Sequence, residues 1–217
     1  MKILLISSSP RKSKSRTFAL AHEVMKGAGS AKELEVIHLR DHTIEFCRHC
    51  EKCHKKILDC PIKDDVPAIL KKMLAADGII FATPNYINHV TASMKSLMER
   101  ASHFIHCKRL LEKYVAGVVS SGSGHDNDVL DYIKQYAHTC GAQYSGGVSS
   151  AAVTVEEKFG EARAFGKKLR DDIEKKRRYE DQLHAIEEGR NYFKRVIMLR
   201  KKDWPDEYRY WQKKKWL

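Results

Sequence analysis

The sequence predicts an α/β protein built on a doubly wound, five-stranded parallel sheet. Short apolar runs alternate along the chain with longer segments whose apolar residues recur at helical spacing. The run GIIFATP at 78–84 has no polar alternation, which is typical of a strand buried on both faces of a parallel sheet. The chain has 217 residues, enough for one such domain and an appendage.

The first half of the chain predicts three strands and the first two connecting helices. Residues 2–6 form a compact apolar run, and after a polar loop residues 18–28 carry apolar side chains at helical spacing. Residues 35–39 are the expected second strand. A helix over 66–73 then leads to the third strand at 78–84. This order of elements is typical of strand-helix-strand units in parallel sheets.

The second half repeats the alternation of helices and strands. A helix is expected over 92–104, a strand over 114–120 and a helix over 127–140. The small and polar stretch 144–155 supplies a fifth strand at the edge of the sheet. A long charged helix over 155–179 completes the doubly wound domain.

Residues 180–217 form a C-terminal extension beyond the domain at 1–179. The extension is rich in large aromatic side chains, namely Trp204, Tyr208, Tyr210, Trp211 and Trp216. Such aromatic density is unlike the composition of disordered segments. We expect the extension to pack on the domain or on a neighbouring subunit, with a solvated tail as the alternative.

The formal net charge of +12 raises the question of nucleic-acid binding. Residues 167–217 hold 17 Lys and Arg against 10 Asp and Glu, so 7 of the excess positive charges lie in the last quarter of the chain. Mixed signs at this spacing are typical of solvated helices. We therefore expect no nucleic-acid partner. No apolar segment approaches the roughly 20 residues of a membrane helix, and the expected location is the cytoplasm.

Four of the six cysteines fall within the loop at 46–61, with the spacing C-x2-C-x2-C-x6-C. They are Cys47, Cys50, Cys53 and Cys60. The close spacing of the first three lets one irregular segment direct three thiolates at one centre, and the fourth closes the site from a longer loop. Such sulfur ligands suit an iron-sulfur cluster or zinc. A group of thiols without a metal is the further alternative.

Two histidines interleave the cysteines, and two further cysteines stand alone. His49 and His54 are interpreted as exposed bystanders and not as ligands. Cys107 and Cys140 are interpreted as half-buried packing residues, because a reactive thiol needs an electropositive and accessible setting.

Three loops are expected at the carboxyl edge of the sheet, where ligands of open parallel sheets bind. The segment SSPRKSKSRT at 8–17 joins a strand to a helix start and offers hydroxyls and an arginine, which suits a phosphate. TPNY at 83–86 offers a tyrosine beside a strand end, and 120–124 offers glycines that let backbone approach a flat ring. A site with a phosphate end and a flat end has the shape of flavin mononucleotide (FMN). We expect the cysteine loop at the same edge.

At this point three segments resemble a known family. SSPRKSKSRT, CRHCEKCHKKILDCPIKDD and LAADGIIFATPNYINHVTASMKSLMER are similar to the iron-sulfur flavoproteins within the flavodoxin-like NAD(P)H-dependent FMN reductase superfamily. The resemblance covers about residues 1 to 175 and implies a flavodoxin-like fold, noncovalent FMN, a [4Fe-4S] cluster on the four cysteines, and a homodimer or homotetramer. The chain departs from the family pattern at Ser8, Lys14, Ser15 and Glu99.

Carried over by position, the resemblance implies where each cofactor is held. The phosphate would lie among Ser9, Arg11, Ser13, Ser15 and Thr17. The isoalloxazine would lie along Pro84, Asn85, Tyr86 and Ile87. Its other border would be Ser121, Gly122, Ser123 and Gly124. The cluster would be held by Cys47, Cys50, Cys53 and Cys60.

The expected function is that of an FMN-dependent oxidoreductase or electron-transfer flavoprotein that relays electrons between a [4Fe-4S] cluster and FMN. Ferredoxin or NAD(P)H is the expected donor. No catalytic acid, base or nucleophile is assigned, because the cofactors supply the reactivity. The first alternative is a cluster-free NAD(P)H-dependent FMN or quinone reductase. The second is a zinc-stabilised nucleic-acid-binding module.

Overall fold

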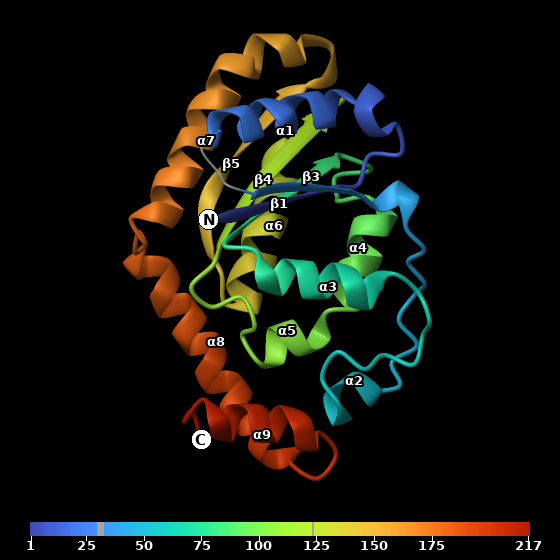
Figure 1. The fold of residues 1–217 in the computed structure, drawn as a ribbon, viewed down its shortest axis with the longest axis vertical. Coiled ribbons are helices and arrows are strands. Elements are labelled where there is room, and N and C mark those ends of the chain that lie inside the picture. Colours follow the sequence, from blue (N-terminus) through green and yellow to red (C-terminus); the bar gives the residue numbers. More distant parts are fainter. Residues whose placement is uncertain (30–32, 123) are drawn as a thin grey trace.

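A five-stranded parallel sheet forms the centre of the fold (Figure 1). The computed structural model describes residues 1–29, 33–122 and 124–217, and the strand order is β2-β1-β3-β4-β5. The strands are β1 (Lys2–Ser7), β2 (Glu33–His38), β3 (Gly78–Pro84), β4 (Tyr114–Ser121) and β5 (Gln143–Ala151). The order reverses beside β1, so a crevice for ligands lies at the carboxyl ends of β1 and β3.

Helices cover both faces of the sheet (Figure 1). One face packs against α1 (Arg16–Gly27) and α7 (Phe159–Glu174). The other face packs against α3 (Val66–Ala75), α4 (Ala92–Glu99), α5 (Ser102–His106) and α6 (Asp126–Cys140). In β1, Ile3 and Leu5 enter the first core and Leu4 and Ile6 enter the second. This alternation follows from the two-residue period of a strand, and it explains why the run is apolar throughout.

Two of the predicted helices have different bounds in the structure. The predicted helix at 92–104 is wrong as a single helix, because the chain leaves helical geometry at Ala101 (φ −100°, ψ 27°), directly after the side chain of Arg100 turns into the cysteine loop. The predicted helix at 155–179 starts later and ends earlier, since the 3-10 segment η3 (Ala152–Lys158) precedes α7. The mixed charges of this region run through both segments, so the pattern does not mark the boundary.

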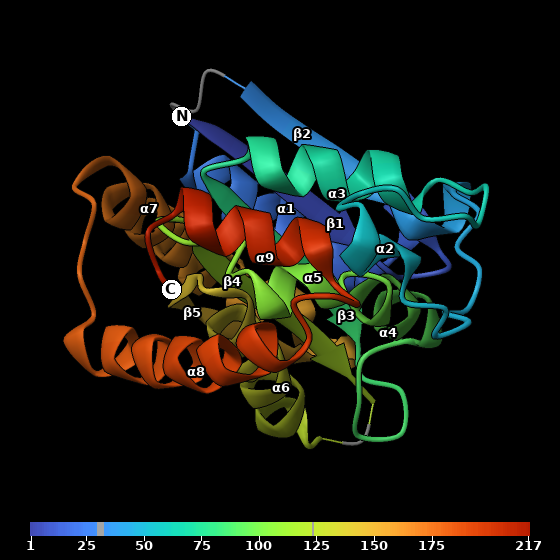
Figure 2. The ribbon, with the colours of Figure 1, turned by 90° about the horizontal axis from the view of Figure 1, so that it is seen from below.

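The C-terminal extension folds as α8 (Glu180–Leu199) and α9 (Pro205–Lys213) and packs on the domain. Figure 2 shows α9 beside α2 (Lys52–Lys55), the short helix of the cysteine loop. Ile197, Trp204 and Trp211 of the extension form a small core with Cys107. The alternative of a solvated tail is therefore wrong. Cys107 and Cys140 are packing residues, more deeply buried than expected.

The described residues also form two short 3-10 segments, η1 (Lys12–Lys14) and η2 (Leu39–Asp41). Within the described ranges, every helix is too short or too polar to cross a lipid bilayer.

Candidate flavin and cysteine sites

The loop after β1 ends in the amino terminus of α1. Ser15 caps this helix, because its hydroxyl accepts a hydrogen bond from Phe18 N at 3.3 Å. The first N–H groups of the helix have no partner inside it and favour an anion. Arg11 is exposed and forms no ion pair with any described residue, whereas Arg16 pairs with Glu156 at 2.9 Å. The loop therefore offers an uncommitted guanidinium beside a helix amino terminus.

Several of the predicted phosphate ligands also shape the loop itself. The Thr17 and Ser120 hydroxyls share a buried hydrogen bond of 2.6 Å that ties the loop to the end of β4. Ser9 Oγ accepts a hydrogen bond from Arg11 N at 3.4 Å, and Ser13 is exposed. A hydroxyl has one donor and two acceptor positions, so these groups retain capacity for a ligand.

A strained turn follows β3 at Pro84. Tyr86 N donates to His89 O at 3.0 Å and His89 N donates to Tyr86 O at 3.2 Å, which closes the turn. Ile87 has a φ of 54° and is 98% exposed. A β-branched residue in the left-handed region is a genuine outlier, and such strain is found most often at functional sites. Tyr86 and Ile87 thus present apolar surface to the outside at the carboxyl edge of the sheet.

Asn85 connects this turn to the glycine-rich loop after β4. Its Nδ2 donates to Gly124 O at 2.7 Å, and its backbone N–H donates to Ser120 O at 2.8 Å. Its Oδ1 is buried and has no hydrogen-bond partner among the described residues. An unpaired buried acceptor costs free energy, so Asn85 Oδ1 is a place for a donor from a ligand.

The glycine-rich loop leaves open space at its surface. Apart from its chain neighbours, no described residue has an atom within 4 Å of a Cβ added to Gly122 or Gly124, and Gly124 has a φ of 85°. Ser121 Oγ accepts a hydrogen bond from Gly124 N at 3.1 Å. The predicted contact Ser123 lies outside the described residues. The open space in front of the loop suits a flat ring that approaches the backbone.

A cavity of about 360 Å³ lies between the first loop and the turn after β3. Ser8 and Pro10 line it on one side, and Tyr86 and Thr91 line it on the other. Of the predicted FMN contacts only Tyr86 lines this cavity, whereas the hydrogen bonds Thr17–Ser120 and Asn85–Gly124 join the three predicted loops to one another.

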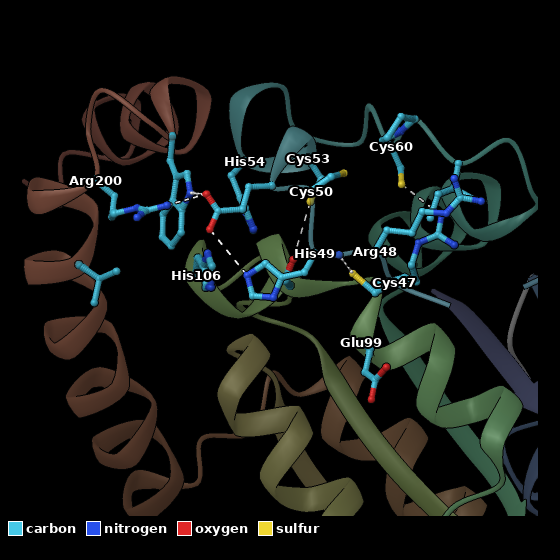
Figure 3. Close-up of a pocket in the computed structure, with 17 residues that line it drawn as sticks. Cys47, Arg48, His49, Cys50, Cys53, His54, Cys60, Glu99, His106 and Arg200 are labelled. Atoms are coloured by element: carbon cyan, nitrogen blue, oxygen red, sulfur yellow. Dashed lines mark hydrogen bonds and ion pairs between the residues drawn. The ribbon is translucent and has the colours of Figure 1, made fainter. Parts of the chain in front are cut away.

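A second, larger cavity of about 670 Å³ is lined by all four clustered cysteines (Figure 3). These cysteines are all free thiols. Glu99, Arg100 and Ser102 line the same cavity, so it lies at the end of α4, whereas Thr91 at the start of α4 lines the smaller cavity. The eight residues of α4 span about 12 Å. The flavin region and the cysteine cavity therefore lie at opposite ends of α4, and the expectation that both share one edge of the sheet stays a prediction.

Arg100 and Asp64 hold the last cysteine in place. Arg100 binds both carboxylate oxygens of Asp64, at 2.6 and 3.1 Å, and donates to Cys60 Sγ at 3.2 Å. Burial by itself raises the pKa of Asp64, but the hydrogen bonds and charge of Arg100 outweigh it and lower the pKa. Both residues lie within the segments that resemble the family, but the sequence pattern assigns a role to neither. The available signal was limited to their positions, with Arg100 directly after the amphipathic α4 and Asp64 just before the start of α3.

The other cysteines also have hydrogen-bonding neighbours. His49 N donates to Cys47 Sγ at 3.4 Å, and the Cys53 sulfur lies 3.8 Å from Ser102 Oγ. Burial raises the pKa of the Cys53 thiol, but the hydrogen bond and charge of His54 outweigh it, so the pKa is lowered. His49 is exposed as expected, whereas the interpretation of His54 as an exposed bystander is wrong, because it is buried.

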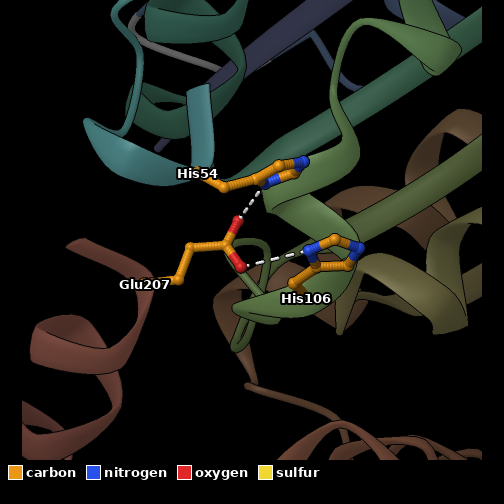
Figure 4. A group of neighbouring side chains, drawn as sticks. All are labelled: His54, His106 and Glu207. Atoms are coloured by element: carbon orange, nitrogen blue, oxygen red, sulfur yellow. Dashed lines mark hydrogen bonds and ion pairs between the residues drawn. The ribbon is translucent and has the colours of Figure 1, made fainter. Parts of the chain in front are cut away.

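The four sulfurs do not converge on a single point. Among the described residues, only His54, His106 and Glu207 form a group of three potential metal ligands whose ligand atoms lie within 4.8 Å of one another (Figure 4). No three of the clustered cysteine sulfurs form such a group. In a tetrahedral zinc site, each thiolate sulfur lies about 2.3 Å from the metal, so the sulfurs lie about 3.8 Å from one another. The cysteines are therefore spaced more widely than one zinc ion requires.

The sequence matches the family described as NADPH-dependent FMN reductase over residues 1–157. The chain belongs to this family. It is 40% identical over 126 residues to an iron-sulfur flavoprotein of Archaeoglobus fulgidus, a match that covers 56% of this chain and 60% of that protein. It is 37% identical over 135 residues to an iron-sulfur flavoprotein of Methanocaldococcus jannaschii, covering 62% and 69%.

Solved structures confirm the fold of this member of the FMN reductase family. A flavone reductase superposes with a TM-score of 0.67 at 20% identity, covering 86% of this chain and 69% of that chain. A flavodoxin from the domain Archaea superposes with a TM-score of 0.54 at 15% identity, covering 80% and 99%. The predicted flavodoxin-like sheet is thus confirmed, with strand order 2-1-3-4-5.

Proposed function

We propose that this FMN reductase family member is a flavin-dependent oxidoreductase that binds FMN and a [4Fe-4S] cluster and relays electrons between them. The observation that carries the proposal is the larger cavity. Four free cysteines line it, in a chain similar to proteins named iron-sulfur flavoproteins. FMN and the cluster would supply the redox chemistry, and the protein would supply binding, orientation and electrostatics.

The residues at the carboxyl edge of the sheet fit FMN. Arg11 and the amino terminus of α1 would bind the phosphate, with hydroxyls from Ser9, Ser13, Ser15 and Thr17. The unpaired Asn85 Oδ1 would accept a hydrogen bond from the flavin ring. The open surface of the glycine-rich loop would border the ring from the other side. Together these features support the flavin assignment.

The residues of the larger cavity fit a cluster. Cys47, Cys50, Cys53 and Cys60 would be its ligands. Donors already face two of the sulfurs, from His49 N and the Arg100 guanidinium, and the Ser102 hydroxyl lies beside the Cys53 sulfur. Hydrogen bonds and positive charge at the sulfurs raise the reduction potential of such a cluster.

The proposal includes a role for a second subunit, with which the separation of the two sites is compatible. The flavin region lies at the start of α4 and the cysteine cavity lies at its end. A homodimer or homotetramer would bring the cluster of one chain to the flavin of another. Ferredoxin or NAD(P)H would deliver the electrons.

The test is the composition of protein purified without oxygen. We expect about four iron atoms and one FMN per chain, with the broad visible absorption and reduced-state paramagnetic signal of an iron-sulfur cluster. The variant Cys53→Ala should lose the iron signal and keep the flavin, whereas Cys140→Ala, at a buried packing cysteine, should keep both. A flavin spectrum with no iron, joined to efficient NADPH oxidation by a quinone, would instead establish the cluster-free reductase. Stoichiometric zinc in place of iron would also contradict the proposal.

A further inference from the structure

The C-terminal extension makes polar contacts with the middle of the cysteine loop (Figure 3). Trp204 Nε1 donates to Glu51 Oε2 at 3.2 Å, and Arg200 binds the same oxygen at 2.5 Å. Asp206 Oδ2 accepts a hydrogen bond from Ile57 N at 2.8 Å. These contacts join two segments that lie about 150 residues apart in the chain. The extension therefore covers the loop at both ends of α2.

Glu207 lies at the centre of this contact and is 0% exposed (Figure 4). Its Oε1 lies 2.6 Å from His54 Nδ1, and its Oε2 lies 3.1 Å from His106 Nδ1. The two imidazole rings stack with centroids 4.8 Å apart, and the Trp204 ring lies 4.7 Å from each of them. One carboxylate thus connects the cysteine loop, α5 and α9.

The loop needs such support because its own structure is short. Helix α2 has four residues, and its N-cap Glu51 is left-handed, with a φ of 57° and no side-chain cap. A single helical turn is unstable in isolation, since nucleation costs more than one turn of hydrogen bonds returns. His54 is part of this turn and directly follows Cys53. Whatever holds His54 also holds Cys53.

We propose that Glu207 is a positioning residue for the cysteine site. Its carboxylate fixes the His54 ring, and the ring anchors the α2 turn so that Cys53 is held in place before a cluster binds. This inference rests on the proposed cluster for its purpose, but the loop anchoring that it describes exists without the cluster.

The same three side chains could instead ligate a metal ion. The distances favour hydrogen bonds, because each Nδ1 faces a different carboxylate oxygen at hydrogen-bond length. A zinc ion bound at about 2.0–2.2 Å would separate its nitrogen and oxygen ligands to about 3.3 Å. The experiments below therefore also measure whether a metal ion is bound.

The first experiment compares Glu207→Gln with Glu188→Gln in metal-free, reduced protein. Glu188 lies on the extension, and its side chain is 70% exposed, so it serves as the matched control. Trypsin should cut the loop at Lys52, Lys55 or Lys56 about tenfold faster in Glu207→Gln than in the wild type, because removing one partner of a buried charged hydrogen bond favours local opening. Glu188→Gln should match the wild type.

The second experiment uses protein that carries the cluster and measures iron release to a chelator. Glu207→Gln should release iron about tenfold faster while its FMN content stays at the wild-type level. If Glu207 acts through His54, the double variant with His54→Gln should release iron no faster than His54→Gln alone. Additive effects of the two substitutions would contradict the proposal.

Folding of the extension is followed independently by tryptophan fluorescence. The chain has three tryptophans, and all lie in the extension, at Trp204, Trp211 and Trp216. Native emission in Glu207→Gln would show that α9 remains docked. If the emission changes, His54→Gln removes the contact from the loop side, where Trp211 and Ile197 still anchor the extension, and the same faster cleavage is expected.

The outcomes separate this proposal from the proposed function. Wild-type protein that never binds iron would overturn the cluster, while the trypsin comparison would still decide the role of Glu207. Equal cleavage and equal iron release in Glu207→Gln and Glu188→Gln would overturn the positioning role. One zinc ion per chain that is lost in Glu207→Gln would overturn it in favour of a metal site.

Discussion

Arg100 is the residue that connects most parts of the cysteine site. Its guanidinium binds Asp64, Cys60 and the backbone oxygen of Glu45, and the Arg100 and Asp64 side chains are 1% and 0% exposed. Removing these two charges from water costs free energy. The two parallel hydrogen bonds between the guanidinium and the carboxylate offset this cost only while both partners are present. The pair therefore fixes where Cys60 lies relative to the end of α4.

We predict that Arg100→Met lowers the free energy of unfolding of the metal-free protein by about 3–5 kcal/mol, because the buried Asp64 carboxylate loses its counter-charge and keeps only the N–H groups of Glu45 and Val66 as partners. Urea denaturation under reducing conditions measures the loss. Arg178→Met is the control, since Arg178 and its partner Glu180 are largely exposed, and it should change stability by less than about 1 kcal/mol. Similar losses in the two variants would mean that the buried pair has no special role.

His103 gives the protein a specific sensitivity to acid. Burial, with a smaller contribution from Arg109, lowers its pKa to about 3, and its Nδ1 has no partner among the described residues. The unfolded chain binds this proton near pH 6.5 and the folded chain does not, so the stability present above pH 6.5 is lost as the pH falls toward 3.

We predict that the wild type loses about 2 kcal/mol more stability between pH 7 and pH 5 than His103→Leu does. Urea denaturation at the two pH values gives this difference. His184 has a side chain that is 76% exposed, so His184→Leu should keep the wild-type pH dependence. An unchanged slope in His103→Leu would show that His103 titrates normally in the folded protein.

At the scale of elements, α1 and α7 cross at two glycines. A Cβ atom on Gly166 would lie 1.9 Å from Val24 O, and one on Gly27 would lie 2.0 Å from Arg163 O. The two backbones are thus in direct contact, which no larger residue permits. Gly160 lies in the same helix α7 and has no atom within 4 Å of its added Cβ.

We predict opposite effects of the same substitution at these two glycines. Gly166→Ala should destabilise the protein by about 1–3 kcal/mol or more through overpacking, although alanine favours the helix. Gly160→Ala should be neutral or stabilise by up to about 1 kcal/mol. Thermal or urea unfolding measures both. A stabilised Gly166→Ala would show that the helices can separate without cost.

At Tyr144, the outer edge of β5 pairs with a side chain of the extension. Gln182 Oε1 accepts a hydrogen bond from Tyr144 N at 2.7 Å, and Gln182 Nε2 donates to Tyr144 O at 3.1 Å. The carboxamide thus pairs with the strand as a neighbouring peptide would. It does so next to the irregularity at Val115/Ala116 in the pairing of β4 and β5. An edge paired in this way is protected from association with other chains.

We predict that Gln182→Ala costs about 1–3 kcal/mol, because it leaves the buried Tyr144 N–H without a partner. Faster amide exchange at Tyr144, together with urea unfolding, measures the effect. Gln212 is exposed on the same extension, and Gln212→Ala should leave both readouts unchanged. Unchanged exchange at Tyr144 in Gln182→Ala would mean that water replaces the carboxamide without cost.

Elements that are determined by their own local sequence could be predicted. The strand at 78–84 has the predicted bounds, because a continuous apolar run ends at a proline. The break at Ala101 could not be predicted, since it accompanies a contact between Arg100 and the distant Asp64. The burial of His54 likewise depends on Glu207, 153 residues away. Sequence patterns identified the cysteines as a site, but contacts that arise only in the folded chain determine what surrounds them.

At the scale of the whole molecule, the two candidate cofactor regions are built from different structural elements. The flavin region is built from loops of the sheet, whereas the cysteine cavity is enclosed by α4, α5 and the extension. Each region can therefore be disabled separately. Cys53→Ala removes a proposed cluster ligand. Ser15→Asp keeps an N-cap side chain on α1 and places a negative charge where the phosphate would bind.

This separation allows a test of electron transfer between subunits by mixing the two variants. We predict that neither Cys53→Ala nor Ser15→Asp alone supports reduction of FMN through the cluster by reduced ferredoxin. A mixture that has exchanged subunits should regain this activity, because in the proposed oligomer one chain would contribute the cluster and its partner would contribute the flavin. Rapid-mixing absorbance of the flavin measures the recovery, and a mixture of Cys53→Ala with itself is the control. Hetero-oligomers that form but stay inactive would place the electron path within one chain, along the roughly 12 Å of α4.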